Sequence, residues 1–157
     1  MDISTTLAVL LIGFAAGLRA LTPPAVVAWC AFLGWINLDA TPFSFMSSWI
    51  AVAIFSLLAL GEYIGDLLPS APDRTALPGL IARIATGSFS AACVLAATGN
   101  GVAFALLGGL AAVAGAFAGL HLRRGAVRSL KTRDAFIAIP EDVIAILITI
   151  FAVWIAA

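Results

Sequence analysis

"VIAILITIFAVWIAA", residues 143–157, is the stretch that decides the fold class. It shows no alternation of apolar and polar positions, whereas a membrane β-barrel is built from segments of about ten residues that alternate in this way. The whole 157-residue chain has the same character, since 63% of its residues are hydrophobic, 10% are charged and the mean hydropathy is +1.15. One soluble core could not hide so many apolar side chains. The sequence therefore predicts an all-α protein, a polytopic transmembrane helical bundle that forms a single domain over residues 1–157.

Six apolar segments predict six helices. They run at about 3–18, 20–37, 45–67, 80–98, 101–122 and 137–157. The first two contain about 16 to 18 residues each, fewer than the roughly 20 that usually cross the hydrocarbon core of a bilayer. Their length favours a bent hairpin over two full spans.

The basic residues predict the orientation of the chain. The stretch "RRGAVRSLKTR", residues 123–133, is the most basic part of the sequence, and the positive-inside rule places it in the cytoplasm. When spans are counted from there, the 68–80 loop and the turn at Arg19 fall on the same side, while Asp2, Asp39 and Asn100 fall on the other. We therefore expect a protein of the bacterial inner membrane with both termini in the periplasm.

Glycine pairs indicate close packing between helices. Such pairs lie on one helix face and let a neighbouring backbone approach closely. They account for packing within one protomer or between protomers, and their number predicts homo-oligomerisation. The three G-x-x-x-G pairs are Gly13 and Gly17, Gly61 and Gly65, and Gly115 and Gly119.

Charged side chains inside the apolar segments are the candidates for function. Glu62 and Asp66 lie four residues apart, so they project from one helix face. Acids at the carboxyl end of a helix oppose its dipole, which favours a paired or functional role over a hydrated helix end. Arg19 precedes Pro23 and Pro24, which interrupt helix continuity. Because a charged side chain near the bilayer centre costs roughly 2.5 to 3.5 kcal/mol on insertion scales, Arg19 should be paired or functional unless it snorkels to the interface.

Three further residues complete the candidate set. Arg83 lies about one turn into the fourth segment, where it could face the acids. Glu141 and Asp142 follow Pro140, an order typical of a helix start, in which proline suits the first turn and acids complement the positive dipole end. Capping alone would explain these two acids, but they lie on the same predicted membrane face as Glu62. We therefore predict one polar site near the cytoplasmic side that binds a substrate or an ion, formed by Arg19, Glu62, Asp66, Arg83, Glu141 and Asp142.

Familiar soluble enzyme chemistry is absent from the sequence. It contains no Ser-His-Asp set, P-loop or G-x-G-x-x-G motif. His121 stands beside Arg123 and Arg124 at the end of an apolar run, where an interfacial role is expected rather than a catalytic one. Cys30 and Cys93 lie alone in apolar segments, as small buried thiols do. The sequence predicts no cofactor and no nucleic-acid partner, and it leaves open whether the carboxylates hold a metal ion.

Several blocks carry a family resemblance. The stretches "GLRALTPPAVVAW", "LGEYIGDLLPSAPDRT" and "PEDVIAI", with a glycine-rich fifth segment that ends in "RR", resemble the signature blocks of a bacterial family of small polytopic inner-membrane proteins catalogued as a domain of unknown function. The resemblance covers most of the chain, and its R-A-L-T-P-P and G-E-x-x-G-D-x-x-P blocks are specific. Family members often carry Lys after the Asp of the G-D pair, where this chain has Leu67, so a partner for Asp66 is removed. The resemblance implies a fold but no activity.

Three functions remain open. The preferred interpretation is a small inner-membrane transporter or channel-like protein, because the acids can exchange partners between arginine and an ionic substrate that is coupled to protons or a cation. A non-catalytic assembly or packing protein is the second. The third is a membrane enzyme that acts on a lipid phosphate, with carboxylates that hold Mg²⁺ and arginines that bind phosphate. The sequence lacks the D-x-x-D-G-x-x-A-R block of the alcohol phosphatidyltransferases and a histidine suited to catalysis, so a non-enzymatic protein is favoured.

Overall fold

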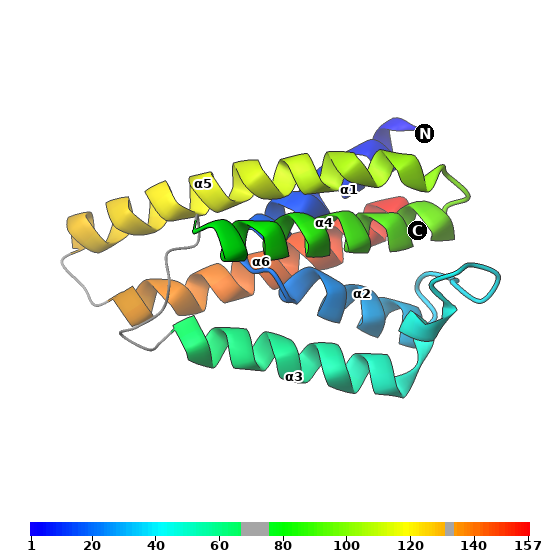
Figure 1. Cartoon of the computed structure of the whole chain (residues 1–157), viewed down its shortest axis with the longest axis horizontal. Helices are drawn as coiled ribbons and strands as arrows, with labels where there is room; N and C mark the ends of the chain where they lie inside the picture. The colour runs from blue at the N-terminus through cyan, green and yellow to red at the C-terminus, as the bar shows by residue number, and fades with distance from the viewer. Residues whose placement is uncertain (67–75, 131–133) are drawn as a thin grey trace.

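The computed structural model describes residues 1–66, 76–130 and 134–157, apart from the side chains of residues 130 and 134–136 (Figure 1). Within these ranges, six α-helices follow one another along the chain, and α3 to α6 are long and apolar enough to cross a membrane. The helical membrane class predicted from the sequence is therefore confirmed. The elements are α1 (Ile3–Leu18), α2 (Thr22–Phe32), η1 (Ser44–Ser47), α3 (Trp49–Asp66), α4 (Leu77–Ala97), η2 (Val102–Phe104), α5 (Ala105–Leu130) and α6 (Asp134–Ala156).

α1 and α2 form a helical hairpin. α1 has 16 residues and so rises about 24 Å, less than the roughly 30 Å thickness of the hydrocarbon core. The chain leaves the helix at Arg19, whose backbone is extended (φ −141°, ψ 111°). Pro23 and Pro24 lie in the first turn of α2, where their missing N–H groups cost no helical hydrogen bond. α2 then runs back toward the end of the bundle at which the chain begins (Figure 1). We call residues 19–21 the hairpin tip.

α1 is the central helix of the bundle and contacts α4, α5 and α6. Glycines allow α1 and α5 to pack backbone against backbone. A Cβ atom at Gly13 would collide with the carbonyl group of Gly108, and one at Gly115 would collide with the carbonyl group of Phe14. Gly17 is equally crowded by the backbone of α5. Gly13, Gly17 and Gly115 therefore serve packing within the protomer.

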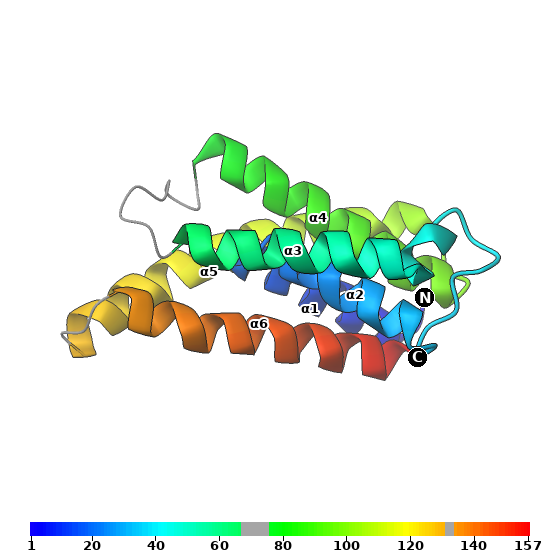
Figure 2. The ribbon, with the colours of Figure 1, turned by 90° about the horizontal axis from the view of Figure 1, so that it is seen from below.

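α3 lies at the periphery of the bundle, where it packs mainly on α2 (Figures 1 and 2). Its buried residues are Ala51, Val52 and Ala59. A Cβ atom at Gly61 or Gly65 would meet no heavy atom of the described residues within 4 Å. Of the three glycine pairs, this one is left open for another helix, so homo-oligomerisation stays a prediction that rests mainly on α3.

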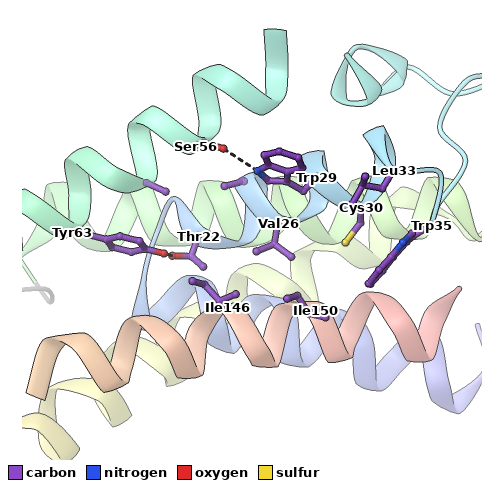
Figure 3. A pocket seen from close by; sticks show the side chains of 12 residues that line it. Thr22, Val26, Trp29, Cys30, Leu33, Trp35, Ser56, Tyr63, Ile146 and Ile150 are labelled. Carbon is purple, nitrogen blue, oxygen red and sulfur yellow. Dashed lines mark hydrogen bonds between the residues drawn. The ribbon is translucent and has the colours of Figure 1, made fainter. Parts of the chain in front are cut away.

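A glycine ends α2 at Phe32, five residues earlier than the sequence predicted. Gly34 has φ +77°, a left-handed conformation that glycine adopts without strain. The N–H of Trp35 then donates to the carbonyl oxygen of Cys30 at 2.8 Å, and the N–H of Gly34 donates to that of Ala31 at 3.1 Å. These two bonds form a Schellman-type helix end. They position Trp35 beyond the end of α2, beside α6 (Figure 3).

α5 is longer than predicted. The sequence placed a loop at residues 123–134, but α5 continues to Leu130. The residues of this stretch include alanine, leucine and arginine, which are good helix formers, and Arg128 in the last turn complements the negative end of the helix dipole.

α6 also begins earlier than predicted, at Asp134, so Pro140 lies inside the helix. The interpretation of Glu141 and Asp142 as residues of a first helical turn is therefore wrong. Apolar residues before Pro140 continue the helix past the one backbone hydrogen bond that a proline removes. The position of the two acids is explained instead by the arginines with which they form ion pairs, Arg19 for Asp142 and Arg123 for Glu141.

Both chain termini lie at one end of the bundle, which we call the termini end (Figures 1 and 2). Which side of the membrane this end faces stays a prediction. The predictions that concern Leu67, most of the 68–80 loop and residues 131–133 lie outside the described residues.

Candidate functional site

Arg19 lies at the hairpin tip and is fully buried, with 0% of its surface exposed. Its Nη1 donates to Oδ2 of Asp66 at the end of α3, and its Nε pairs with Oδ1 of Asp142 on α6. The ring of Tyr63 covers the guanidinium group, with its centroid 5.6 Å from Cζ. Because a buried charge is tolerated only when it is paired, these contacts explain why Arg19 does not snorkel to the interface.

Glu62 closes the hairpin tip from α3. Its carboxylate oxygens accept hydrogen bonds from the N–H groups of Ala20 and Leu21, each at 2.8 Å. These N–H groups precede α2, so the negative charge lies at the positive end of that half-helix. A turn whose backbone groups are enclosed by protein needs protein partners for them. Glu62 supplies those partners.

Arg83 on α4 supports the opposite half-helix. Its Nε donates to the carbonyl oxygen of Gly17 at 3.1 Å, and its Nη1 donates to that of Gly79 at 3.1 Å. Gly17 is in the last turn of α1, where the helix dipole is negative, so the cation is favoured there. Nη2 of Arg83 also lies 3.8 Å from Oε1 of Glu62. Arg83 therefore faces an acid, as the sequence suggested it could.

Arg123 joins the site, although the sequence predicted a loop position for it. Its Nη1 lies 3.1 Å from Oδ2 of Asp66 and 3.6 Å from Oε2 of Glu141. A signal for it was present, because Gly115, Gly119 and Arg123 are spaced by four residues and so share the helix face that packs inward. We call the resulting group the ion cluster: Arg19, Glu62, Asp66, Arg83, Arg123, Glu141 and Asp142.

The ion cluster brings together all six residues predicted as the site. They come from the end of α1 and from α3, α4 and α6, and α5 adds Arg123. Within the described ranges, no three Asp, Glu, His or Cys side chains converge as metal ligands would. Arginines lie between the carboxylates instead. His121 is exposed on α5, where its Nδ1 is 2.7 Å from the carbonyl oxygen of Phe117.

A cavity of about 330 Å³ adjoins the ion cluster and lies between α2, α3 and α6 (Figure 3). At one end, the hydroxyl groups of Thr22 and Tyr63 are 2.7 Å apart, and Tyr63 is the residue whose ring covers Arg19. The other end reaches Trp35. Most of its wall is apolar. The wall residues include Ala25, Val26, Cys30, Ala59, Ile146 and Ile150.

A second cavity, of about 450 Å³, lies at the termini end. Polar side chains line it, among them Asp2, Asn37 and Asn100. Trp35 lines both cavities. The two cavities therefore neighbour one another at Trp35.

The comparisons with known proteins give a family without a function. The family described as "Domain of unknown function (DUF4126)" matches residues 6–156. No curated protein and no solved structure matches the chain significantly. The match covers nearly the whole chain and confirms the resemblance to an uncharacterised family that the sequence blocks indicated. A small helical membrane protein with a buried ion cluster at its hairpin tip, the chain belongs to the DUF4126 family.

Proposed function

We propose that this protein is a small membrane transporter whose substrate site consists of the ion cluster and the cavity beside it. The observation that carries the proposal is Arg19, a fully buried cation at the break between two half-helices. Transporters commonly build their sites from such interrupted helices, because the helix ends offer charge and free backbone groups at membrane depth. Ionisable residues inside a membrane are costly and are usually functional.

The ion pairs are arranged for partner exchange. Asp66 is shared between Arg19 and Arg123, and Arg19 is shared between Asp66 and Asp142. A substrate charge or a proton that replaces one member of an ion pair frees the other member. The freed side chain can then pair with the next charged side chain of the cluster. Binding therefore needs no charge to be left unpaired in a low-dielectric setting, which would cost several kcal/mol.

The two cavities supply a route. The apolar cavity begins at Thr22 and Tyr63 next to Arg19, and the polar cavity continues from Trp35 to the termini end. α3 covers one side of the apolar cavity, and its buried residues, Ala51, Val52 and Ala59, all precede Glu62. Displacement of this part of α3, with Glu62 and Asp66 kept at their partners, would expose little core. Movement of a weakly packed segment at a cavity wall is a physically inexpensive way to open a site.

Accessibility of the site from both membrane faces tests the proposal without knowledge of the substrate. The assay uses Thr22→Cys in a background in which Cys30 and Cys93 are replaced by alanine. Charged methanethiosulfonate reagents, which do not cross the bilayer, are applied to right-side-out and to inside-out vesicles. A transporter exposes its site alternately, so we expect Thr22→Cys to be modified from both sides.

Two matched positions control the experiment. Ala116→Cys, at a fully buried position of α5, should be modified from neither side. Asn100→Cys, at the termini end, should be modified from one side. Modification of Thr22→Cys from one side alone, or from neither, would contradict the transporter proposal.

A non-catalytic packing protein is the second candidate, and one observation favours it. The Gly61 and Gly65 pair on α3 is open and suits a neighbouring helix. In such a protein the ion cluster would only hold the hairpin in place, and Thr22→Cys would stay protected from both sides. A lipid-phosphate enzyme with Mg²⁺ is less favoured, since the described carboxylates are paired with arginines and do not converge on one point.

A further inference from the structure

The exposed charges of the bundle are separated between its two ends. The formal net charge of the chain is +0, but the acids of the ion cluster are turned inward, with side chains that are 11–19% exposed. At the same end of the bundle, Arg124 and Arg128 are exposed on α5 (Figure 1). The exposed acids among the described side chains, Asp2 and Asp39, lie at the termini end. The described outer surface is therefore basic at the end opposite the termini.

We propose that this end of α5 binds the head group of an anionic phospholipid. The site is one exposed face of the helix, which begins apolar and ends basic, and we call it the α5 stripe. The inference concerns an outer surface of the bundle and does not depend on the proposed transporter. The α5 stripe consists of Leu106, Leu110, Phe117, His121, Arg124 and Arg128.

The α5 stripe is continuous along the helix. Its residues follow one another at intervals of three, four or seven positions, which places them on one helix face. Leu106 and Leu110 are 72% and 68% exposed, and Phe117 is 46% exposed. In a membrane-embedded bundle these side chains meet acyl chains. The stripe changes from apolar to polar at His121, which therefore marks the boundary between the hydrocarbon core and the lipid head groups.

The length of α5 brings its basic end to the level of the head groups. The helix has 26 residues and rises about 39 Å, about 9 Å more than the thickness of the hydrocarbon core. Each head-group layer adds roughly 5–8 Å to that thickness. Arg124 and Arg128 are one turn apart in the part of α5 that exceeds the core. Both guanidinium groups can therefore reach the phosphate of one lipid.

The chemistry of the basic end favours an anionic lipid over a zwitterionic one. Guanidinium groups donate paired N–H groups to phosphate oxygens. Phosphatidylcholine brings its own cation close to the arginines, whereas phosphatidylglycerol does not. Among the described side chains, no acid is exposed at this end to compete with the phosphate. Each arginine near an anionic lipid surface contributes roughly a fivefold preference, so Arg124 and Arg128 together predict about 25-fold.

Quenching of tryptophan fluorescence by brominated lipid tests the inference. The reporter protein carries Phe117→Trp, and its four native tryptophans are replaced by phenylalanine. It is reconstituted in vesicles of phosphatidylcholine and phosphatidylglycerol, with bromine on the acyl chains of one lipid at a time. We expect phosphatidylglycerol to bind beside this reporter with a relative binding constant above about 10. A matched protein that keeps Trp154 alone, which is 67% exposed on α6 near the termini end, should show a constant near one.

Variants of the two arginines identify the head-group site. Arg124→Gln and Arg128→Gln should each lower the preference for phosphatidylglycerol about fivefold, and the double variant should bring it close to one. Arg124→Lys keeps the charge and should lower it less than Arg124→Gln. Both side chains are exposed, so the fold should persist, and unchanged quenching of Trp154 verifies this. An unchanged preference in the double variant would overturn the inference.

A soluble phosphate is the competing ligand. If inorganic phosphate removes the lipid preference at the Phe117→Trp reporter, and sodium chloride of the same ionic strength does not, the site takes a free anion and the inference is wrong. An equal preference for phosphatidylglycerol at Trp154 would also overturn it, because the enrichment would then not be local to the α5 stripe.

Discussion

Glu62→Gln tests whether the carboxylate holds the hairpin tip. The side chain keeps its size, but one acceptor oxygen becomes an amide group that faces the N–H of Ala20 or Leu21. A hydrogen bond to a charged group contributes about 1.5–3 kcal/mol, and a buried N–H without an acceptor costs about 1–3 kcal/mol. Loss of the charge at the start of α2 adds up to about 1 kcal/mol. Because the Glu62 side chain is only 13% exposed, we expect the free energy of unfolding to fall by about 3–5 kcal/mol.

Thermal unfolding in a mild detergent measures this effect. For a chain of 157 residues, such a loss corresponds to a decrease in Tm of about 10 °C. Asp39→Asn is the matched control, since the same acid-to-amide change occurs at an exposed turn, and we expect its Tm to change by less than about 2 °C. A Tm of Glu62→Gln equal to that of the control would refute the role of Glu62 at the hairpin tip.

Three further predictions concern pairing, packing and orientation. Arg19→Gln should lower the free energy of unfolding by about 3–5 kcal/mol, since it leaves Asp142 without its arginine, and Asp142→Asn should lower it less because Arg19 keeps Asp66 as a partner. The double variant should lose at least about 1 kcal/mol less than the sum; additive losses in equilibrium unfolding would contradict one buried network. Gly13→Ala should lower the Tm strongly, because its Cβ atom collides with the carbonyl group of Gly108. Gly61→Ala should leave the Tm of the monomer unchanged, because its Cβ atom meets no described atom within 4 Å. Equal Tm values for the two variants would show that α1 and α5 are not in backbone contact. Cysteines added at the two termini should both be labelled from the periplasm by an impermeant maleimide, since both termini lie at one end, and labelling of either from the cytoplasm alone would overturn the predicted orientation.

The glycine pairs show that a packing motif does not specify which helix it packs against. The sequence interpretation counted the pairs as a reason for homo-oligomerisation, and Gly115→Leu would be the obvious substitution to test it. A side chain at Gly115 would collide with Phe14 within the same protomer. That substitution therefore cannot separate internal packing from assembly. Gly61→Leu on α3 is the better probe, because the described part of the protomer leaves its face open.

The amino-acid sequence by itself determined the class of the protein, its helical segments and the charged residues that had to be paired. Long apolar runs leave a backbone in lipid no alternative to the helix, because every N–H and C=O group needs a partner inside the segment. Arg19, Glu62, Asp66 and Arg83 stood out for a related reason, since charges in apolar segments are costly unless they are paired. The short first two segments also predicted the hairpin.

Only the tertiary structure decided which partner each of these residues takes. Arg19 pairs with Asp66, 47 residues away, and Glu62 bonds backbone groups of the hairpin tip, with Arg83 as a more distant ionic partner. Arg123 entered the cluster because α5 continues past its expected end and glycines let it approach α1. A local sequence pattern can reveal that a charge needs a partner, because the free-energy cost of burying the charge depends on the apolar segment that carries it. The identity of that partner depends on how helices distant in sequence pack, and no local pattern contains that geometry.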